Sequence, residues 1–263
     1  MILCLDTGNS QIHGGVFADG TLRAQFRKST HPLGSSDELG VFFMAVLRAQ
    51  GIEPSSIKRI ALCSVVPAAL HSIRGACERY FGHAPFVLQA GVKTGLKIKY
   101  RNPHEVGSDR IANGIGATQL HPGKDLIVVD CGTATTFDVV TAAGDYLGGV
   151  IMPGLGISAE TLASNTAKLR RVEITKPDHA LGRSTVESIQ SGLYNGHVGA
   201  IRHILWSLTI ENFPGTSPVV IGTGGFAGMF RDAGLFPEVI PDLVLRGLHR
   251  AAELNPGAEL AAE

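Results

Sequence analysis

Two aspartates, each placed between an apolar segment and a glycine, are the residues of this chain best suited to bind ions and phosphates. The first apolar segment ends in Asp6 and leads into Thr7-Gly8-Asn9-Ser10, and the second ends in Asp130 and leads into Cys131-Gly132-Thr133-Ala134. An aspartate at the end of a strand can hold a hydrated cation, and a glycine in the turn lets backbone N–H groups approach phosphate oxygens. Two such turns that face each other would bind a nucleotide polyphosphate from both sides.

A third candidate carboxylate, Asp109, occurs in the segment that runs from Tyr100 to Arg110. Gly107 and Ser108 are small and leave this carboxylate approachable. Aspartate has a reference pKa of about 3.9, so it is ionised at neutral pH and can accept a proton from a hydroxyl group. A purely structural interpretation competes, because an aspartate near a helix N-terminus is stabilising by itself. With Tyr100 and Arg110 nearby, we interpret the segment as a candidate hydroxyl-substrate site.

The elements that position these residues follow the same plan twice. We predict strands over 2–6, 11–17, 21–28, 57–66, 85–90, 96–101, 125–130, 135–140, 145–151 and 218–221. We predict helices between Ser35 and Gly51, between Pro67 and Gly82, and over 106–120, 156–169 and 185–213. Each half starts with a strand, an Asp-bearing turn and a hairpin, so the sequence predicts two similar α/β domains with mixed sheets, joined near residue 120. Ligands of such sheets bind at the carboxyl ends of the strands, where both turns would lie.

Short local signals indicate where several of these elements begin and end. An Asp-Gly pair at 19–20, between two alternating segments, predicts a tight hairpin. Ser35 with Glu38, and Ser184 with Glu187, have the spacing of a helix-capping box. These pairs predict the first turns of two helices.

Composition restricts the partners that the chain can have. The 263 residues carry a formal net charge of +0 and a pI of about 7.2, which gives no basis for electrostatic capture of nucleic acid or of an anionic membrane. Met1 is followed directly by an apolar strand without a basic leader, and no segment is long enough to span a bilayer, so we expect a cytoplasmic protein. Cys4, Cys63, Cys77 and Cys131 form no C-x-x-C pair, and we expect buried free thiols rather than zinc ligands or a redox motif.

Glycines at two further places suggest a close approach of backbones. The turn Gly222-Thr223-Gly224-Gly225 is interpreted as the lid of an adenosine pocket, and the sequence contains no P-loop signature. Gly192, Gly196 and Gly199 fall within one predicted helix, where each costs stability unless another backbone packs there. Helix packing within the chain and a dimer seam both explain these three glycines.

Several motifs, taken in this order, resemble those of the type III pantothenate kinases, within the superfamily of sugar kinases, actin and Hsp70-type ATPases. The resemblance covers nearly the whole chain, and the motifs at 107–110 and 130–136 are its most specific part. The matching motifs are Asp6-Thr7-Gly8-Asn9-Ser10, Tyr100-x-Asn102-Pro103, Gly107-Ser108-Asp109-Arg110, Asp130-x-Gly132-Thr133-Ala134-x-Thr136, Gly148-Gly149-x-Ile151-x-Pro153-Gly154, Gly182-x-Ser184-Thr185 and Gly222-Thr223-Gly224-Gly225.

This resemblance implies a fold and an activity. The fold would be α/β, with two similar ribonuclease-H-like or actin-like domains over 1–120 and 121–263, mixed sheets, and a nucleotide cleft between the domains. The activity would be ATP-dependent phosphorylation of pantothenate to 4'-phosphopantothenate, the first step of coenzyme A biosynthesis. The implied cofactors are Mg²⁺ with ATP and a monovalent cation, potassium or ammonium. The implied functional unit is a homodimer.

The resemblance also implies roles for individual residues. Asp109 would be the general base, Asp130 would bind the monovalent cation, and Thr133 would belong to the second phosphate loop. The first phosphate loop would comprise Asp6, Thr7, Gly8, Asn9, Ser10, Gln11, Ile12 and His13, with Asp6 facing the metal of Mg-ATP. The pantothenate-binding residues would be Tyr100, Gly107, Ser108, Asp109, Arg110 and Thr185.

Two other functions are compatible with the same motifs. A kinase of this fold could act on another small hydroxylated substrate, or the chain could be a non-catalytic nucleotide-binding regulatory factor. Asp109 distinguishes an enzyme from the second alternative, because a pure sensor has no use for a carboxylate beside a hydroxyl pocket.

Overall fold

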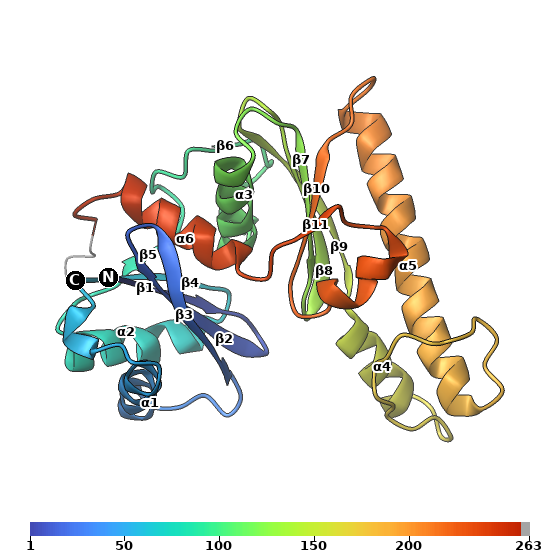
Figure 1. Ribbon diagram of the computed structural model, residues 1–263, viewed down its shortest axis with the longest axis horizontal. Coiled ribbons are helices and arrows are strands. Elements are labelled where there is room, and N and C mark those ends of the chain that lie inside the picture. Colours follow the sequence, from blue (N-terminus) through green and yellow to red (C-terminus); the bar gives the residue numbers. More distant parts are fainter. Residues whose placement is uncertain (259–263) are drawn as a thin grey trace. The chain divides into compact units, whose positions relative to one another are not determined.

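The structure, a computed structural model, describes residues 1–258. The chain folds into two compact units (Figure 1). Unit 1 comprises Met1–Leu120 and the chain from Leu243 onward, and unit 2 comprises His121–Asp242. The sequence predicts domains over 1–120 and 121–263, and the structure differs because the segment from Leu243 packs within unit 1. Residues 259–263 of that predicted domain lie outside the described part of the chain.

Unit 1 is built on a five-stranded mixed sheet with the strand order β3-β2-β1-β4-β5. β1 is antiparallel to β2 and parallel to β4, so the carboxyl ends of β1 and β4 lie side by side. The strands of this unit are β1 (Ile2–Thr7), β2 (Gln11–Ala18), β3 (Thr21–Ser29), β4 (Arg59–Ser64), β5 (Phe86–Val87) and β6 (Lys97–Ile98). Its helices are α1 (Ser36–Ala49), α2 (Pro67–Phe81), α3 (Ser108–Leu120) and α6 (Leu243–Leu254), with short 3₁₀ turns at Pro54–Ser56 and Pro103–Glu105.

Unit 2 repeats this arrangement in its own strands, which follow the order β9-β8-β7-β10-β11. β7 is antiparallel to β8 and parallel to β10, as β1 is to β2 and β4. The repeated order confirms the predicted class of two similar α/β halves with mixed sheets. The strands are β7 (Leu126–Cys131), β8 (Ala134–Val140), β9 (Asp145–Pro153), β10 (Val219–Thr223) and β11 (Glu238–Val239). The helices are α4 (Leu155–Ser164) and α5 (Thr185–Asn212), with a 3₁₀ segment at Ala227–Ala233.

In unit 1, α1 and α2 cover one face of the sheet and α6 covers the other (Figure 1). Leu39, Phe43 and Leu47 recur at helical spacing on α1, and all three are buried in the core. The predicted capping box is confirmed, because Ser35 Oγ accepts a hydrogen bond from the Glu38 N–H at 3.2 Å and the Glu38 carboxylate accepts one from the Ser35 N–H at 2.7 Å.

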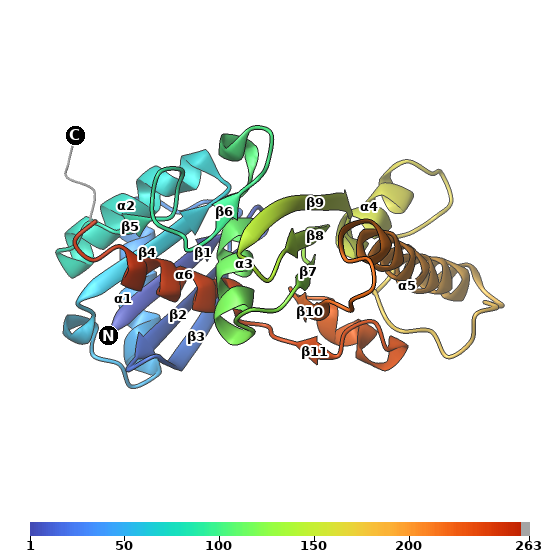
Figure 2. The same ribbon diagram turned by 90° about the horizontal axis from the view of Figure 1, so that it is seen from above.

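Helices α3 and α6 cross at glycines, so that their backbones come into contact (Figure 2). A Cβ on Gly116 would lie 2.7 Å from the carbonyl oxygen of Leu243, and a Cβ on Gly247 would meet the backbone of Ala112. No side chain larger than hydrogen fits at either glycine without moving a helix. The sequence prediction has no helix after residue 225, so α6 is an element that it missed. This crossing fixes the position of α3, whose first turn carries the candidate base.

Helix α5 packs on the sheet of unit 2 through side chains such as Ile189 and Leu193. Ser184 caps this helix and accepts a hydrogen bond from the Glu187 N–H at 3.2 Å, as predicted. The Glu187 carboxylate accepts from the N–H of Arg183 at 2.7 Å, one residue before the position expected for a capping box. The helix therefore starts where the sequence predicts, with a shifted reciprocal bond.

All four cysteines are buried free thiols, as the sequence predicts. Burial raises the pKa of Cys77 and that of Cys131 to about 12, so both thiols stay protonated at neutral pH. Among the helices of the described residues, none has the length and apolar character needed to cross a membrane.

Candidate active site

Asp6 lies at the carboxyl end of β1, where two neighbouring strands meet it. It stands opposite His13 on β2 and opposite Cys63 on β4. The Cys63 thiol donates a hydrogen bond to Asp6 Oδ1 at 3.3 Å. Asp6 is half-buried, and the thiol bonds to one of its two carboxylate oxygens.

The first turn itself is an exposed loop between two buried strands. The Gly8 N–H donates to the Gln11 carbonyl oxygen at 3.0 Å and closes the turn. Asn9, Ser10 and Gln11 are exposed, so their backbone is accessible to a phosphate group. The remaining predicted loop residues are buried in the strands on either side, and they are Thr7, Ile12 and His13.

Asp109 is the second residue of α3, and its carboxylate lies close to the Asp6 turn. The Arg110 N–H donates to Asp109 Oδ1 at 2.8 Å. Burial raises the pKa of Asp109, although this N–H and the Arg110 charge both act in the opposite direction. Burial, followed by the charges of Asp6 and Asp109, raises the pKa of Cys63 well above its usual value. The two carboxylates therefore both act on one thiol, and a carboxylate with a raised pKa is a better proton acceptor near neutral pH.

The residues around Asp109 hold the start of α3 against the end of β4. A Cβ on Gly107 would lie 2.5 Å from Asp109 Oδ1, so this carboxylate position requires glycine. Ser108 Oγ donates to the Ser64 carbonyl oxygen at 3.2 Å. Arg110 is buried, with 7% of its surface exposed. The four residues of the predicted motif at 107–110 are thus together at one helix start.

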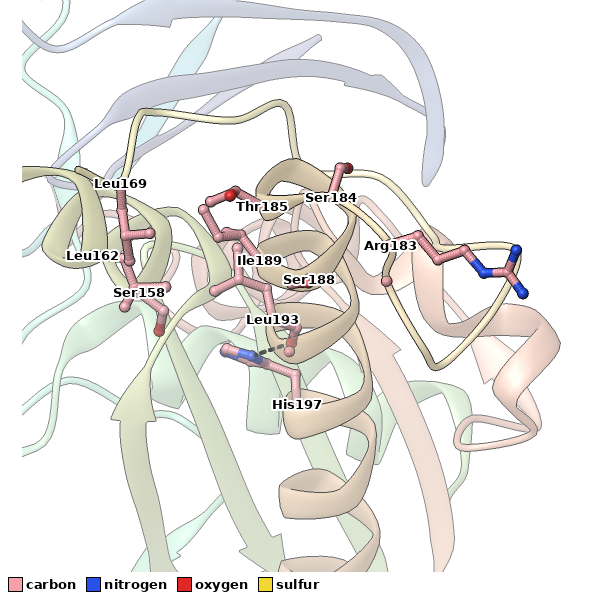
Figure 3. Close-up of a pocket in the computed structure, with 12 residues that line it drawn as sticks. Ser158, Leu162, Leu169, Arg183, Ser184, Thr185, Ser188, Ile189, Leu193 and His197 are labelled. Atoms are coloured by element: carbon pink, nitrogen blue, oxygen red, sulfur yellow. Dashed lines mark hydrogen bonds between the residues drawn. The ribbon is translucent and has the colours of Figure 1, made fainter.

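Tyr100 and Thr185 are the two predicted substrate contacts that lie outside this motif. Tyr100 is half-buried in the segment between β6 and α3. Thr185 is the exposed first residue of α5, beside an open pocket of about 890 Å³ (Figure 3). Apolar side chains that line this pocket are Leu162, Leu169, Ile189 and Leu193.

His197 lies in the same pocket wall as a buried structural residue. Its Nδ1 is 2.8 Å from the carbonyl oxygen of Leu193 (Figure 3), and its Nε2 is 3.2 Å from that of Pro153. The ring therefore links α5 to the end of β9. His197 is therefore a packing residue, because only 6% of it is exposed.

Asp130, the second strand-end aspartate, is enclosed by glycines. It stands opposite Thr223 on β10. A Cβ on Gly132 would lie 3.2 Å from Asp130 Oδ1. Gly224 has a φ of +86°, and a Cβ there would meet the same oxygen and lie 2.7 Å from the carbonyl carbon of Cys131. The backbone at these two glycines thus lies closer to this carboxylate than any residue with a side chain would allow.

The turn at the end of β9 bonds to the backbone of the second loop. The Gly154 N–H donates to the Thr133 carbonyl oxygen at 3.2 Å, and the Gly132 N–H donates to that of Ala134 at 3.1 Å. A Cβ on Gly154 would lie 2.9 Å from the carbonyl carbon of Thr133. Thr133 itself is exposed. Its carbonyl is thus fixed by the backbone of Gly154 while the residue lies at the surface.

The glycines of α5 form an open stripe. A Cβ on Gly192, Gly196 or Gly199 would meet no atom within 4 Å, and all three residues are exposed. Farther along the helix the stripe continues with Trp206 and Ile210, which are 60% and 54% exposed. Helix packing within the described chain therefore does not explain these glycines.

The carboxylates suit cations that are shared with a ligand. Within residues 1–258 no group of three or more His, Cys, Asp or Glu side chains is placed to hold a metal ion. Mg²⁺ is commonly bound by one or two carboxylates together with water and substrate phosphates, so Asp6 beside an exposed loop fits it.

Two halves of equal strand order, each with an Asp-bearing turn at the end of its first strand, give this chain a fold of the actin-like class. A solved structure assigned to the Baf family of transcriptional activators, from Campylobacter jejuni, has a similar fold with a TM-score of 0.59 at 19% identity, over 97% of this chain and 98% of that one. Another, assigned as a 2-dehydro-3-deoxygalactonokinase from Sinorhizobium meliloti, has a TM-score of 0.54 at 14% identity, over 100% and 99% of the two chains.

Within this class, the chain belongs to the type III pantothenate kinase family. The model of that family matches residues 2–206. A type III pantothenate kinase from Legionella pneumophila (strain Corby) is 52% identical over 255 residues, which cover 97% of this chain and 99% of the relative.

Proposed function

We propose that this chain transfers the terminal phosphoryl group of ATP to the primary hydroxyl of pantothenate and so forms 4'-phosphopantothenate for coenzyme A biosynthesis. The observation that carries this proposal is the carboxylate of Asp109, held at the start of α3 with a raised pKa in a chain of this family. A protein that only senses a nucleotide needs phosphate loops but not such a base.

Asp109 accepts the proton of the attacking hydroxyl in this proposal. The Arg110 N–H fixes Asp109 Oδ1, which orients the carboxylate so that its other oxygen meets the substrate. Arg110 also provides the positive charge for the substrate carboxylate, which a guanidinium binds in a two-point geometry. The other proposed pantothenate contacts are Tyr100, Gly107, Ser108 and Thr185.

The two loops bind the phosphates. Phosphoryl transfer depends mainly on positioning and on neutralising the charge that spreads over the phosphate oxygens, and a bound Mg²⁺ supplies part of that charge. Asp6 is the proposed ligand of this ion. The first loop, from Asp6 to His13, and Thr133 of the second loop supply N–H and hydroxyl donors.

A direct test is whether adding pantothenate to the protein with Mg-ATP increases the rate of ADP formation. We expect pantothenate-dependent ADP formation and a phosphorylated product with one phosphate per pantothenate. A chain that binds ATP but forms no ADP with pantothenate would contradict the proposal. In that case a panel of other small primary alcohols would separate a kinase of different specificity from a regulatory module.

We also propose that Asp130 binds a monovalent cation, potassium or ammonium. Asp130 lies near the end of a buried apolar strand and is half-buried, so a bound cation would interact favourably with its charge. We expect dialysed protein to be active in potassium or ammonium and weakly active in sodium alone. Equal rates with sodium as the sole monovalent ion would contradict this assignment and favour a role for Asp130 in Mg²⁺ binding.

The open glycine stripe of α5 supports a homodimer in which a second copy packs on this helix. Small residues four apart share one helix face, so Gly192 and Gly196 would contact the same partner helix. We expect a dimer at micromolar concentration in sedimentation, and a shift toward monomer for Gly196→Leu. Gly228→Leu is the control, because a Cβ on this exposed glycine of unit 2 also meets no atom within 4 Å. A fully active wild-type monomer would exclude the dimer.

A further inference from the structure

Thr30 is a fully buried residue that makes two hydrogen bonds to the backbone of the first phosphate loop. Its Oγ1 donates to the carbonyl oxygen of Gly8 at 2.8 Å. Its backbone N–H donates to the carbonyl oxygen of Ser10 at 3.0 Å. Thr30 follows directly after β3 and is 0% exposed, so both donors are held inside the fold, against the half-buried Gly8 and the exposed Ser10.

These two bonds determine which way the loop presents its donors. In a planar trans peptide the C=O and the following N–H point in opposite directions. The carbonyl of Gly8 points at Thr30, so the N–H of Asn9 points away from it. The carbonyl of Ser10 is directed in the same way, so the N–H of Gln11 also points away from Thr30.

We propose that Thr30 is a positioning residue for the nucleotide, whose hydroxyl presets the first loop so that its N–H groups face the phosphates. Thr30 itself touches no phosphate in this proposal and acts through Gly8. The inference rests on the proposed function, in that the Asp6 turn binds a nucleotide. It does not depend on which hydroxyl compound accepts the phosphoryl group.

The first loop is also held by backbone bonds, so the contribution of the Thr30 hydroxyl can be tested separately. Gly8 N–H donates to the Gln11 carbonyl oxygen and closes the turn without Thr30. The backbone bond from Thr30 to Ser10 survives any substitution except proline. Only the bond to the Gly8 carbonyl depends on the side chain, so an isosteric change from Thr to Val removes one interaction and leaves the rest.

The test measures the affinity of the full chain for Mg-ADP by calorimetry, without pantothenate, for wild type, Thr30→Val and Thr30→Ser. Losing one hydrogen bond to a loop carbonyl, and with it the preset loop, should raise the dissociation constant of Thr30→Val roughly tenfold. Thr30→Ser keeps the hydroxyl and should stay within about twofold of wild type. Thr94→Val is the matched control, because the Thr94 hydroxyl donates to the carbonyl of Leu96 in a different loop of unit 1 at 3.1 Å.

Kinetics separate positioning from a general loss of structure. In Thr30→Val we expect the KM for ATP to rise while the KM for pantothenate stays near the wild-type value. Wild-type nucleotide affinity in Thr30→Val, or an equal loss in Thr30→Ser, would overturn the proposal. If Thr30→Val does not fold, Thr30→Ala replaces it, and equal affinities of the Ala and Ser variants would then overturn it. Failure of wild type to phosphorylate pantothenate would refute the proposed function and leave this affinity comparison intact.

Discussion

The two Asp-bearing turns occupy matching positions in two sheets of the same strand order, yet different groups hold them in place. In the first turn, side-chain donors add to the backbone bonds, through the Thr30 hydroxyl and the Cys63 thiol. Backbone supports the second, where Gly132, Gly154 and Gly224 let neighbouring chain segments approach the loop. The same local pattern in the sequence therefore gives one turn that depends on hydroxyl and thiol donors and one that depends on missing side chains.

The two halves also differ in the last helix of each, which is α3 in the first half and α6 in the second. α3 ends the first half and brings Asp109 to the turn of unit 1. α6 holds the corresponding place in the second half, but it begins with Leu243 and Val244 and packs on α3 within unit 1. Duplication of a sheet thus does not duplicate its site. The proposed base belongs to the first half only, and the role proposed for the second half is binding alone.

The substitution with the largest expected effect removes the proposed base, which only the first half contains. Asp109→Asn keeps the shape of the side chain and the bond from the Arg110 N–H, but it removes the proton acceptor. We expect kcat to fall by about a hundredfold or more, while Mg-ADP affinity stays close to wild type. Steady-state kinetics and calorimetry on the same preparation measure the two quantities.

Asp37→Asn is the matched control for this substitution. Asp37 is also the second residue of a helix in unit 1, and its partner Arg79 lies at 3.1 Å on the exposed surface. Exposed ion pairs contribute little, so the activity of Asp37→Asn should match that of wild type. An Asp109→Asn enzyme that turns over at the wild-type rate would refute the assignment of the base.

Much of the fold was accessible from the sequence because its signals are local. The capping pair Ser35 and Glu38, the Asp-Gly hairpin at 19–20 and the two apolar strands that end in aspartate all specify structure within a few residues. α6 was missed for a different reason. Its contact with α3 links residues more than a hundred positions apart, and the glycines that permit it, Gly116 and Gly247, have no partner that the sequence alone identifies.

The same limit applies to the candidate site. The motif at 107–110 and both aspartates were found because they are contiguous with turns and helix starts. Cys63 and Thr30 carry no motif, and their roles arise from register and from a loop that folds back. Parallel pairing of β1 with β4 sets Cys63 opposite Asp6, which could have been anticipated only after the strand order was known.

A smaller effect sharpens the contrast between the backbones of the two turns. Gly224 lies in the left-handed region with a φ of +86°, and a Cβ there would lie 2.8 Å from the Cys131 nitrogen. Gly224→Ala should therefore lower the free energy of unfolding by about 2 kcal/mol or more. Gly8 does not have a positive φ, and its Cβ would make an ordinary contact of 3.5 Å with Gln11, so Gly8→Ala should change that free energy by less than about 1 kcal/mol. Denaturant unfolding tests both, and equal losses would show that the two turns are held alike.

The smallest expected effect is a change in thermal stability. It arises from Asp109, the same carboxylate whose substitution is expected to reduce kcat most. Burial raises the pKa of Asp109 in the folded state above its value in the unfolded chain. Such a group stabilises the fold at pH values below its unfolded pKa of about 3.9, and this contribution is lost as the pH rises through the folded pKa. Asparagine is neutral at every pH, so Asp109→Asn should unfold at a higher temperature than wild type at pH 7. The difference should shrink as the pH falls toward 4, where wild-type Asp109 is itself becoming protonated. Thermal unfolding of both proteins across this range measures it, with Asp37→Asn as the reference for a carboxylate that is exposed. A variant that is less stable than wild type at pH 7 would mean that the ionised carboxylate stabilises the start of α3. The proposed base would then not reduce the free energy of unfolding.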